Sequence, residues 1–189
     1  MQNQICWIET IDDAEADQDL KKVFDTVRSP QGRLDNLYQA FSLRPHTIKP
    51  ADDLYRAAMH NEANSLPKWL AELIGTYVAI LNGCRYAQAH HSHNFAYLLG
   101  QSGLAPERAH EILQNLQHDN VHACGDKRDV SVLVYVKKLC LEPENMTATD
   151  VAELSMQGWS DGEILEIVQI VAMFSYFVRV INGLGISLQ

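Results

Sequence analysis

Positive charge is scarce in this sequence. The 189 residues include 24 Asp and Glu against 15 Lys and Arg, which gives a formal net charge of −9 at pH 7. No stretch gathers basic residues into a stripe. Nucleic acids and anionic membrane surfaces both bind proteins through clustered Lys and Arg. The composition therefore argues against nucleic acid and against a membrane as partners.

Long uninterrupted apolar runs and dense cysteines are also missing. Residues 1–19 are acidic and lack the basic start and apolar run of a secretory leader. The most apolar stretch, 164–181, is interrupted by Glu166, Gln169 and Arg179, which favours the centre of the fold or a subunit interface over a membrane span. Four cysteines are too few for a disulfide scaffold. We therefore expect a cytoplasmic protein with reduced thiols.

Strand-like alternation of apolar and polar residues is absent as well, whereas helical spacing recurs along the chain. With 47% hydrophobic residues and no linker or repeat, the sequence predicts a single all-α domain. Asp129 is expected to cap one helix, and Thr147 and Ser160 open two capping-box patterns. We expect helices at about 20–27, 34–41, 50–58, 66–81, 84–99, 106–116, 129–139, 147–157 and 164–182, with a loop at 118–127.

The clearest predicted helix spans 66–81, opening at a Ser65 cap and ending at an Asn-Gly pair. Glu72 lies on the side opposite its apolar stripe, where its neighbours are small residues such as Gly75 rather than charges. Small residues in a row indicate a second helix packed close by. We therefore expect Glu72 to be partly buried in that contact.

The most reactive residues cluster at the start of the next predicted helix. Cys84 falls at its N-terminus, where unpaired amide groups and the helix dipole favour a thiolate. His91 lies two turns further along the same face, on the order of 10 Å away along the axis. A thiol, an imidazole and a half-buried carboxylate together are the parts of a proton relay that activates a nucleophile.

The spacing of these residues resembles the motif of the alkylhydroperoxidase D / carboxymuconolactone decarboxylase family. In its redox form that motif is Glu, eleven residues, Cys-x-x-Cys, three residues and His. Glu72, Cys84 and His91 match it, Tyr86 matches a position held by His or Tyr, and Ala87 stands where the second cysteine belongs. The run Asn-Gly-Cys-x-Tyr before a His-His pair is similar to the branch of uncharacterised peroxidase-related proteins. Further similarity at 146–150, 158–161 and 182–185 extends the resemblance over most of the chain from about Leu34.

The resemblance implies an AhpD-like helical bundle, with residues 1–33 as an N-terminal extension and 34–189 as the core. It also implies a homo-oligomer (a dimer, trimer or hexamer) and hydroperoxide reduction by thiol reductants, with no cofactor. In the redox members the second cysteine attacks the peroxide, the first forms a disulfide with it, and Glu and His relay protons. Because Ala87 cannot be oxidised, that disulfide is impossible here, and Cys84 would have to act alone through a sulfenic acid.

Three hypotheses follow. The leading one is a peroxidase-like oxidoreductase that reduces hydroperoxides through Cys84, with Glu72 and His91 directing protons and Tyr86 lining the pocket. It predicts that Cys84 alkylates well below the pH of an ordinary thiol. The second is an acid–base enzyme of the carboxymuconolactone decarboxylase type that uses His91 and Glu72. The third is a catalytically inactive helical oligomer.

Each candidate residue also has a structural interpretation. The structural interpretation of Cys84 is a small buried hydrophobe, and that of Tyr86 is a core residue with a satisfied hydroxyl. Glu72 is alternatively a buried carboxylate paired with Arg85 or Arg179. His90 and His93 are neighbours on one helix face, but two imidazoles without a completing motif do not make a site. We therefore predict no metal.

Overall fold

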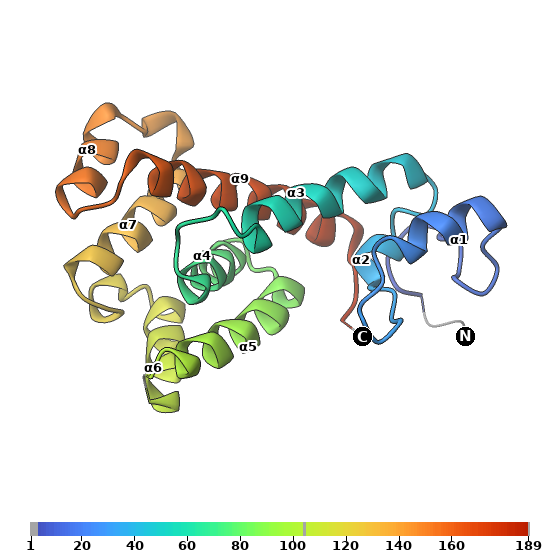
Figure 1. Ribbon diagram of the computed structural model, residues 1–189, viewed down its shortest axis with the longest axis horizontal. Coiled ribbons are helices and arrows are strands. Elements are labelled where there is room, and N and C mark those ends of the chain that lie inside the picture. The colour runs from blue at the N-terminus through green and yellow to red at the C-terminus, as the bar shows by residue number, and fades with distance from the viewer. Residues whose placement is uncertain (1–3, 104, 189) are drawn as a thin grey trace. The chain divides into compact units, whose positions relative to one another are not determined.

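The computed structural model describes residues 4–103 and 105–188, and within these ranges the regular secondary structure is helical. The all-α prediction is confirmed. The elements in chain order are α1 (Gln18–Asp25), α2 (Asn36–Gln39), a 3₁₀ turn η1 (Pro45–Thr47), α3 (Ile48–His60), α4 (Lys68–Leu81), α5 (Arg85–Gln101), α6 (Pro106–Gln117), η2 (Val121–Ala123), α7 (Lys127–Leu141), η3 (Pro143–Asn145), α8 (Ala148–Met156) and α9 (Asp161–Leu184), as Figure 1 shows.

Packing divides the chain into two compact units. One combines the described parts of 1–57 and 179–189, and the other spans 58–178. The first unit has its own apolar core, built from Ala16, Leu20, Phe24, Val27, Leu34 and Ile48. Residues on both sides of the predicted boundary at 33/34 share this core, and that boundary stays a prediction.

The two chain ends are tied together within the first unit. The Trp7 amide donates to the Leu184 carbonyl at 2.8 Å, and the Ser187 amide donates to the Ile5 carbonyl at 2.8 Å. The buried Asn36 side chain donates to the Ser187 carbonyl at 2.9 Å. Its amide therefore fixes the C-terminal segment with a hydrogen bond shielded from water.

The second unit contains α4 to α8 and most of α9. In it α4 and α5 form an antiparallel hairpin, because Cys84 and Gln88 at the start of α5 both reach the Ala79 carbonyl near the end of α4. The α4 helix is buried almost all round, from Leu70 to Ala79. The site below is built on this hairpin and on the part of α9 beside it.

Three helix starts test the predicted capping signals. The capping boxes at Thr147 and Ser160 both form. The predicted Asp129 cap is wrong, because Asp126 caps α7 by accepting the Asp129 amide. The predicted Ser65 cap is also wrong. The Ser65 amide donates instead to the carboxylate of Glu166, an α9 residue far along the chain.

Among the described residues, α9 is the one helix long and apolar enough to cross a membrane by length and composition, with a mean hydropathy of 1.9. Half of that apolar stretch is buried. Core helices of globular proteins have the same properties, so the finding agrees with the expectation of a packed helix. Leu165 and Tyr176 remain exposed on it.

Candidate active site at the α4–α5 hairpin

The structure brings Glu72 of α4 and His91 of α5 into direct contact. His91 Nδ1 lies 2.7 Å from Glu72 Oε2, and both side chains are largely shielded from solvent. Glu72 is only 3% exposed, so it is more deeply buried than its small neighbours led us to expect. The basic partner of Glu72 is thus an imidazole, and the alternative of a carboxylate neutralised by Arg85 is not what the structure shows.

The contact fixes the chemistry of the imidazole. An ionised carboxylate only accepts hydrogen bonds, so Nδ1 is the donor of this contact when Glu72 is ionised. A neutral imidazole that donates through Nδ1 has its lone pair on Nε2. That tautomer is the one a general base requires.

Asn94 holds the second oxygen of the carboxylate. Its Nδ2 donates to Glu72 Oε1 at 3.4 Å, from one turn beyond His91 on α5. Both oxygens of Glu72 are thereby engaged from the same helix, which limits rotation of the carboxylate. Sequence reasoning missed Asn94, although its i+3 spacing from His91 was the available signal.

A close approach between α4 and α9 seals the pair on another side. The Phe174 ring meets the His91 ring edge-on at 4.6 Å between centroids. It also lies against Gly75, where an added Cβ would come within 2.3 Å of Phe174 Cζ. Only glycine leaves room for the ring here. The predicted close helix contact is confirmed, and Phe174 is the residue that makes it.

Cys84 occupies the predicted position but has a different environment from the one expected. It is the residue before the first turn of α5, its side chain caps no amide of that helix, and the nearby Tyr86 and Ala87 amides lower the pKa of its thiol. Its side chain is 0% exposed, and burial raises the pKa of the thiol more than the two amides lower it. The expectation of a readily ionised thiol is therefore wrong, because the cost of burying a thiolate outweighs the helix terminus.

The remaining candidate residues lie on α5 near Cys84 and His91. Tyr86 is buried, and its ring packs against His90 at 4.8 Å between centroids. Ala87 is buried beside Cys84 in the first turn. His93 is exposed on α5. Within the described residues no group of three or more His, Cys, Asp and Glu side chains could hold a metal ion.

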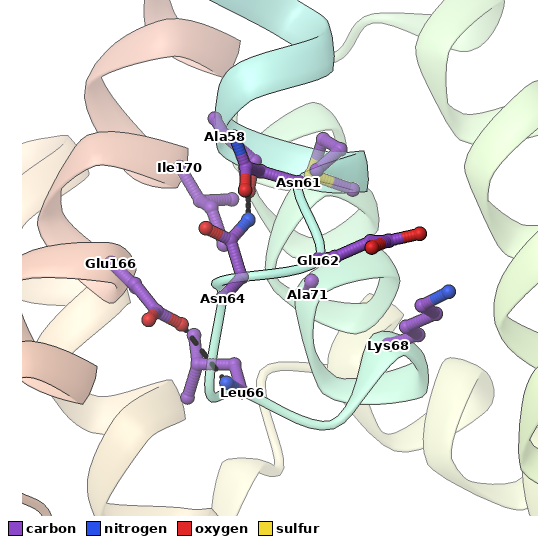
Figure 2. A pocket seen from close by; sticks show the side chains of 10 residues that line it. Ala58, Asn61, Glu62, Asn64, Leu66, Lys68, Ala71, Glu166 and Ile170 are labelled. Atoms are coloured by element: carbon purple, nitrogen blue, oxygen red, sulfur yellow. Dashed lines mark hydrogen bonds between the residues drawn. The ribbon is translucent and has the colours of Figure 1, made fainter.

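A cavity of about 220 Å³ lies between the end of α3, the start of α4 and α9 (Figure 2). Its apolar wall is made of buried residues, and polar residues of the α3–α4 loop complete the lining. The apolar residues are Ala58, Met59, Leu66, Ala71 and Ile170, and the polar ones are Asn61, Glu62, Asn64, Lys68 and Glu166.

Comparison with solved structures places this geometry in a known fold. The structure is similar to the AhpD core of an uncharacterised peroxidase-related protein from Ralstonia eutropha JMP134, with a TM-score of 0.81 and 19% identity over 99% of this chain and 94% of that one. A second peroxidase-related protein, from Silicibacter sp. TM1040, gives 0.78 and 19% over 98% and 92%. The chain has the AhpD-like fold. No family model matches the sequence, and neither does any curated protein.

The AhpD-like fold also includes a protein with a different name. The debrominase Bmp8 matches with a TM-score of 0.69 and 16% identity over 100% of this chain and 94% of that one. A Cys-to-Ala variant of it, in complex with 2,3,4-tribromopyrrole, matches equally well at 15% identity. Proteins named for different reactions thus share this fold, so the activity must be argued from the residues of the site.

Proposed function

We propose that this protein is an enzyme that transfers protons to and from a small-molecule substrate, with the buried Glu72–His91 pair as its reacting centre. The observation that carries the proposal is the 2.7 Å contact between His91 Nδ1 and Glu72. It orients the imidazole, and Asn94 and Phe174 hold the two partners in place. A carboxylate and imidazole kept from water in this way are the parts of a general base.

The chemistry follows from the tautomer. His91 Nε2 removes a proton from carbon or oxygen of the substrate, and the imidazolium formed is stabilised by Glu72. The imidazolium exchanges this proton with solvent and then gives a proton to a different atom of the substrate, or to the leaving group. Such a cycle needs no cofactor. We further propose that the protein acts in the cytoplasm. A homo-oligomer of the AhpD-like fold is part of the same proposal.

A second candidate is the reduction of hydroperoxides through Cys84. The thiolate would attack the outer peroxide oxygen, giving a sulfenic acid and an alkoxide that takes a proton from His91. Two external thiols would then restore Cys84, releasing water and their own disulfide. This candidate is favoured by the Tyr86 and Ala87 amides, which lower the pKa of the thiol, and by the peroxidase-related proteins of similar fold.

We rank it second for three reasons. The Cys84 thiol is fully buried, and burial raises its pKa. The position of the second motif cysteine is Ala87, so no disulfide can form within the motif. His91 lies two helical turns from Cys84, about 10 Å along the axis, which is too far for direct proton transfer.

The test compares two activities in four proteins. Proton transfer is measured as deuterium uptake from D₂O into a panel of small ketones and lactones, followed by NMR. Thiol chemistry is measured as consumption of cumene hydroperoxide, and of 2,3,4-tribromopyrrole, with dithiothreitol as reductant. The proteins are the wild type, His91→Asn, Cys84→Ser and His93→Asn, the last being a matched control at an exposed histidine of the same helix.

We expect deuterium uptake to fall at least 100-fold in His91→Asn and to stay within twofold of the wild type in His93→Asn and Cys84→Ser. Uptake that survives in His91→Asn would overturn the proposal. Peroxide or bromopyrrole turnover that disappears in Cys84→Ser, with no deuterium uptake in the wild type, would replace it by thiol chemistry.

A further inference from the structure

The cavity in Figure 2 and the Gly75–Phe174 contact beside the Glu72–His91 pair occupy successive turns of α4 and α9. On α4, Ala71 lies in the cavity wall, and Gly75, four residues further on, is the residue that the Phe174 ring covers. Residues four apart on a helix share a face and are separated by about 6 Å along the axis. The cavity wall at Ala71 is therefore one helical turn from the Phe174 contact.

The same relation holds on α9. Ile170 lines the cavity, and Phe174, four residues on, covers Gly75 and touches the His91 ring. Phe174 thus lies one turn beyond the cavity wall, at the contact with His91. Cys84 follows the opposite end of α4, so along this helix the cavity lies nearer to Glu72 than to the thiol.

The size of the cavity limits what it can hold. An apolar cavity of about 150 Å³ binds benzene in a well-studied protein. At about 220 Å³ this one accommodates a benzene ring with a short substituent, or a branched aliphatic group of similar size. The apolar part of its wall is formed by Met59, Leu66, Ala71 and Ile170, which are all at most 6% exposed.

The charged residues of the cavity are Glu62, Lys68 and Glu166, which together carry one formal negative charge. The Glu166 carboxylate already accepts the Ser65 amide at 2.8 Å and the Leu66 amide at 2.9 Å, and Figure 2 draws its bond to Leu66. Glu62 and Lys68 carry opposite charges at one side of the cavity, and both are exposed to solvent. The charge of Glu166 is thus engaged by backbone amides, and a charged group driven into the apolar wall would lose its hydration without a partner there.

We propose that this cavity is a substrate-binding pocket next to the reacting centre, and that Phe174 separates it from His91. The pocket binds the non-reacting part of a neutral aromatic or branched aliphatic substrate. The inference rests on the proposed function for the role of the pair. The substrate body lies against Ala71 and Ile170, and movement of the Phe174 ring brings the reacting atom to His91 Nε2. The occupancy of the cavity itself does not depend on any reaction.

Binding is tested with three unreactive probes of one shape: benzyl alcohol, benzoate and benzylammonium. The reporter is the ¹³C-labelled methyl group of Met59, which lines the cavity, and the control within the same sample is Met156, an exposed methionine on α8. We expect benzyl alcohol to shift the Met59 signal saturably, with a Kd at least tenfold lower than that of either ion. A saturable preference for an ion, or no saturable shift for any probe, would overturn the proposal.

Two substitutions change the volume in opposite directions. Ala71→Leu fills the cavity and should weaken benzyl alcohol binding at least tenfold, whereas Ala152→Leu, at an exposed alanine of α8, should leave the Kd unchanged. Ile170→Val removes a methylene group and should improve binding of the bulkier 2-phenylpropan-2-ol at least threefold. An unchanged Kd in both cavity variants would contradict the location of the site.

A last measurement separates this inference from the proposed function. Saturating benzyl alcohol should shift the imidazole ¹⁵N signals of His91 but not those of exposed His93, and should raise KM for deuterium uptake without lowering kcat. Binding at Met59 that leaves the His91 signals unchanged would overturn the proposal that the cavity serves the reacting centre, even if the enzyme proposal holds. If His91→Asn keeps full activity while the probe shifts the Met59 and His91 signals of the wild type, the enzyme proposal fails and the proposed binding pocket remains.

Discussion

Replacing Gly75 by alanine tests the close contact on which the site depends. In a free helix the change would stabilise the fold by about 1 kcal/mol, because alanine loses less backbone entropy than glycine. Here the new Cβ would lie 2.3 Å from Phe174 Cζ and 2.5 Å from Cε2. Carbon atoms in contact are about 3.5–4.0 Å apart, so the ring has to move by more than about 1 Å.

The Phe174 ring can make that movement only by giving up packing contacts, because it is 2% exposed and lies against His91. Forcing an extra methyl group into a packed core typically costs about 1–3 kcal/mol, and more where neighbours cannot give. We therefore expect Gly75→Ala to lose about 1–2 kcal/mol net, which for a chain of this size lowers Tm by about 2–8 °C.

The assay is thermal and urea unfolding of Gly75→Ala beside a matched glycine. Gly100, in the last part of α5, has no atom within 4 Å of its would-be Cβ, so Gly100→Ala should be neutral or stabilising by up to about 1 kcal/mol. In a Phe174→Leu background, Gly75→Ala should cost at least about 1 kcal/mol less than in the wild type. Equal costs in the two backgrounds, or a Gly75→Ala protein as stable as the wild type, would refute the reasoning.

Two further predictions follow from titrating groups. Because burial raises the pKa of the Cys84 thiol, iodoacetamide at pH 7 should modify the less buried Cys140 first, and Cys84 only on unfolding or at clearly alkaline pH; peptide mass spectrometry decides, and rapid native labelling of Cys84 would contradict its burial. The ammonium of Lys138 and the Thr147 cap lower the pKa of Asp150 to about 2. Its contribution to stability is thus present above its ordinary pKa near 4 and is lost as pH falls toward 2, so Asp150→Asn should lower the urea midpoint at pH 7 and progressively less below pH 4.

Local sequence signals were sufficient for the helices and for the position of Glu72. The stripe from Leu66 to Leu81 needs no tertiary information, since helical spacing alone separates its apolar face from its small-residue face. The neighbours of Glu72 on that second face predicted a close contact, and Gly75 provides it. Helix starts were less secure, because more than one residue near 126–129 can accept an amide hydrogen bond, and only the backbone decides which one does.

Local sequence signals could not predict which distant side chains contact the site residues. Phe174 is 83 positions from His91, and which turn of α9 meets Gly75 depends on the packing register rather than on any local pattern. The prediction that the Cys84 thiol ionises readily failed for a related reason. A helix terminus is visible in the sequence, whereas the burial that opposes it comes from side chains elsewhere in the fold.

The antiparallel hairpin separates two chemistries that the motif places close together in sequence. Cys84 lies at the turn end and is itself fully buried, between the exposed Gly83 and Arg85. Glu72 and His91 lie two turns back along the hairpin, and Ala71 and Lys68 of the cavity lie further along α4. In our proposal, a substrate held in that cavity reaches the imidazole before it reaches the sulfur. Ala87 stands where the redox motif has its second cysteine, one turn nearer to His91 than Cys84, and our proposal therefore assigns the reaction to the acid–base pair.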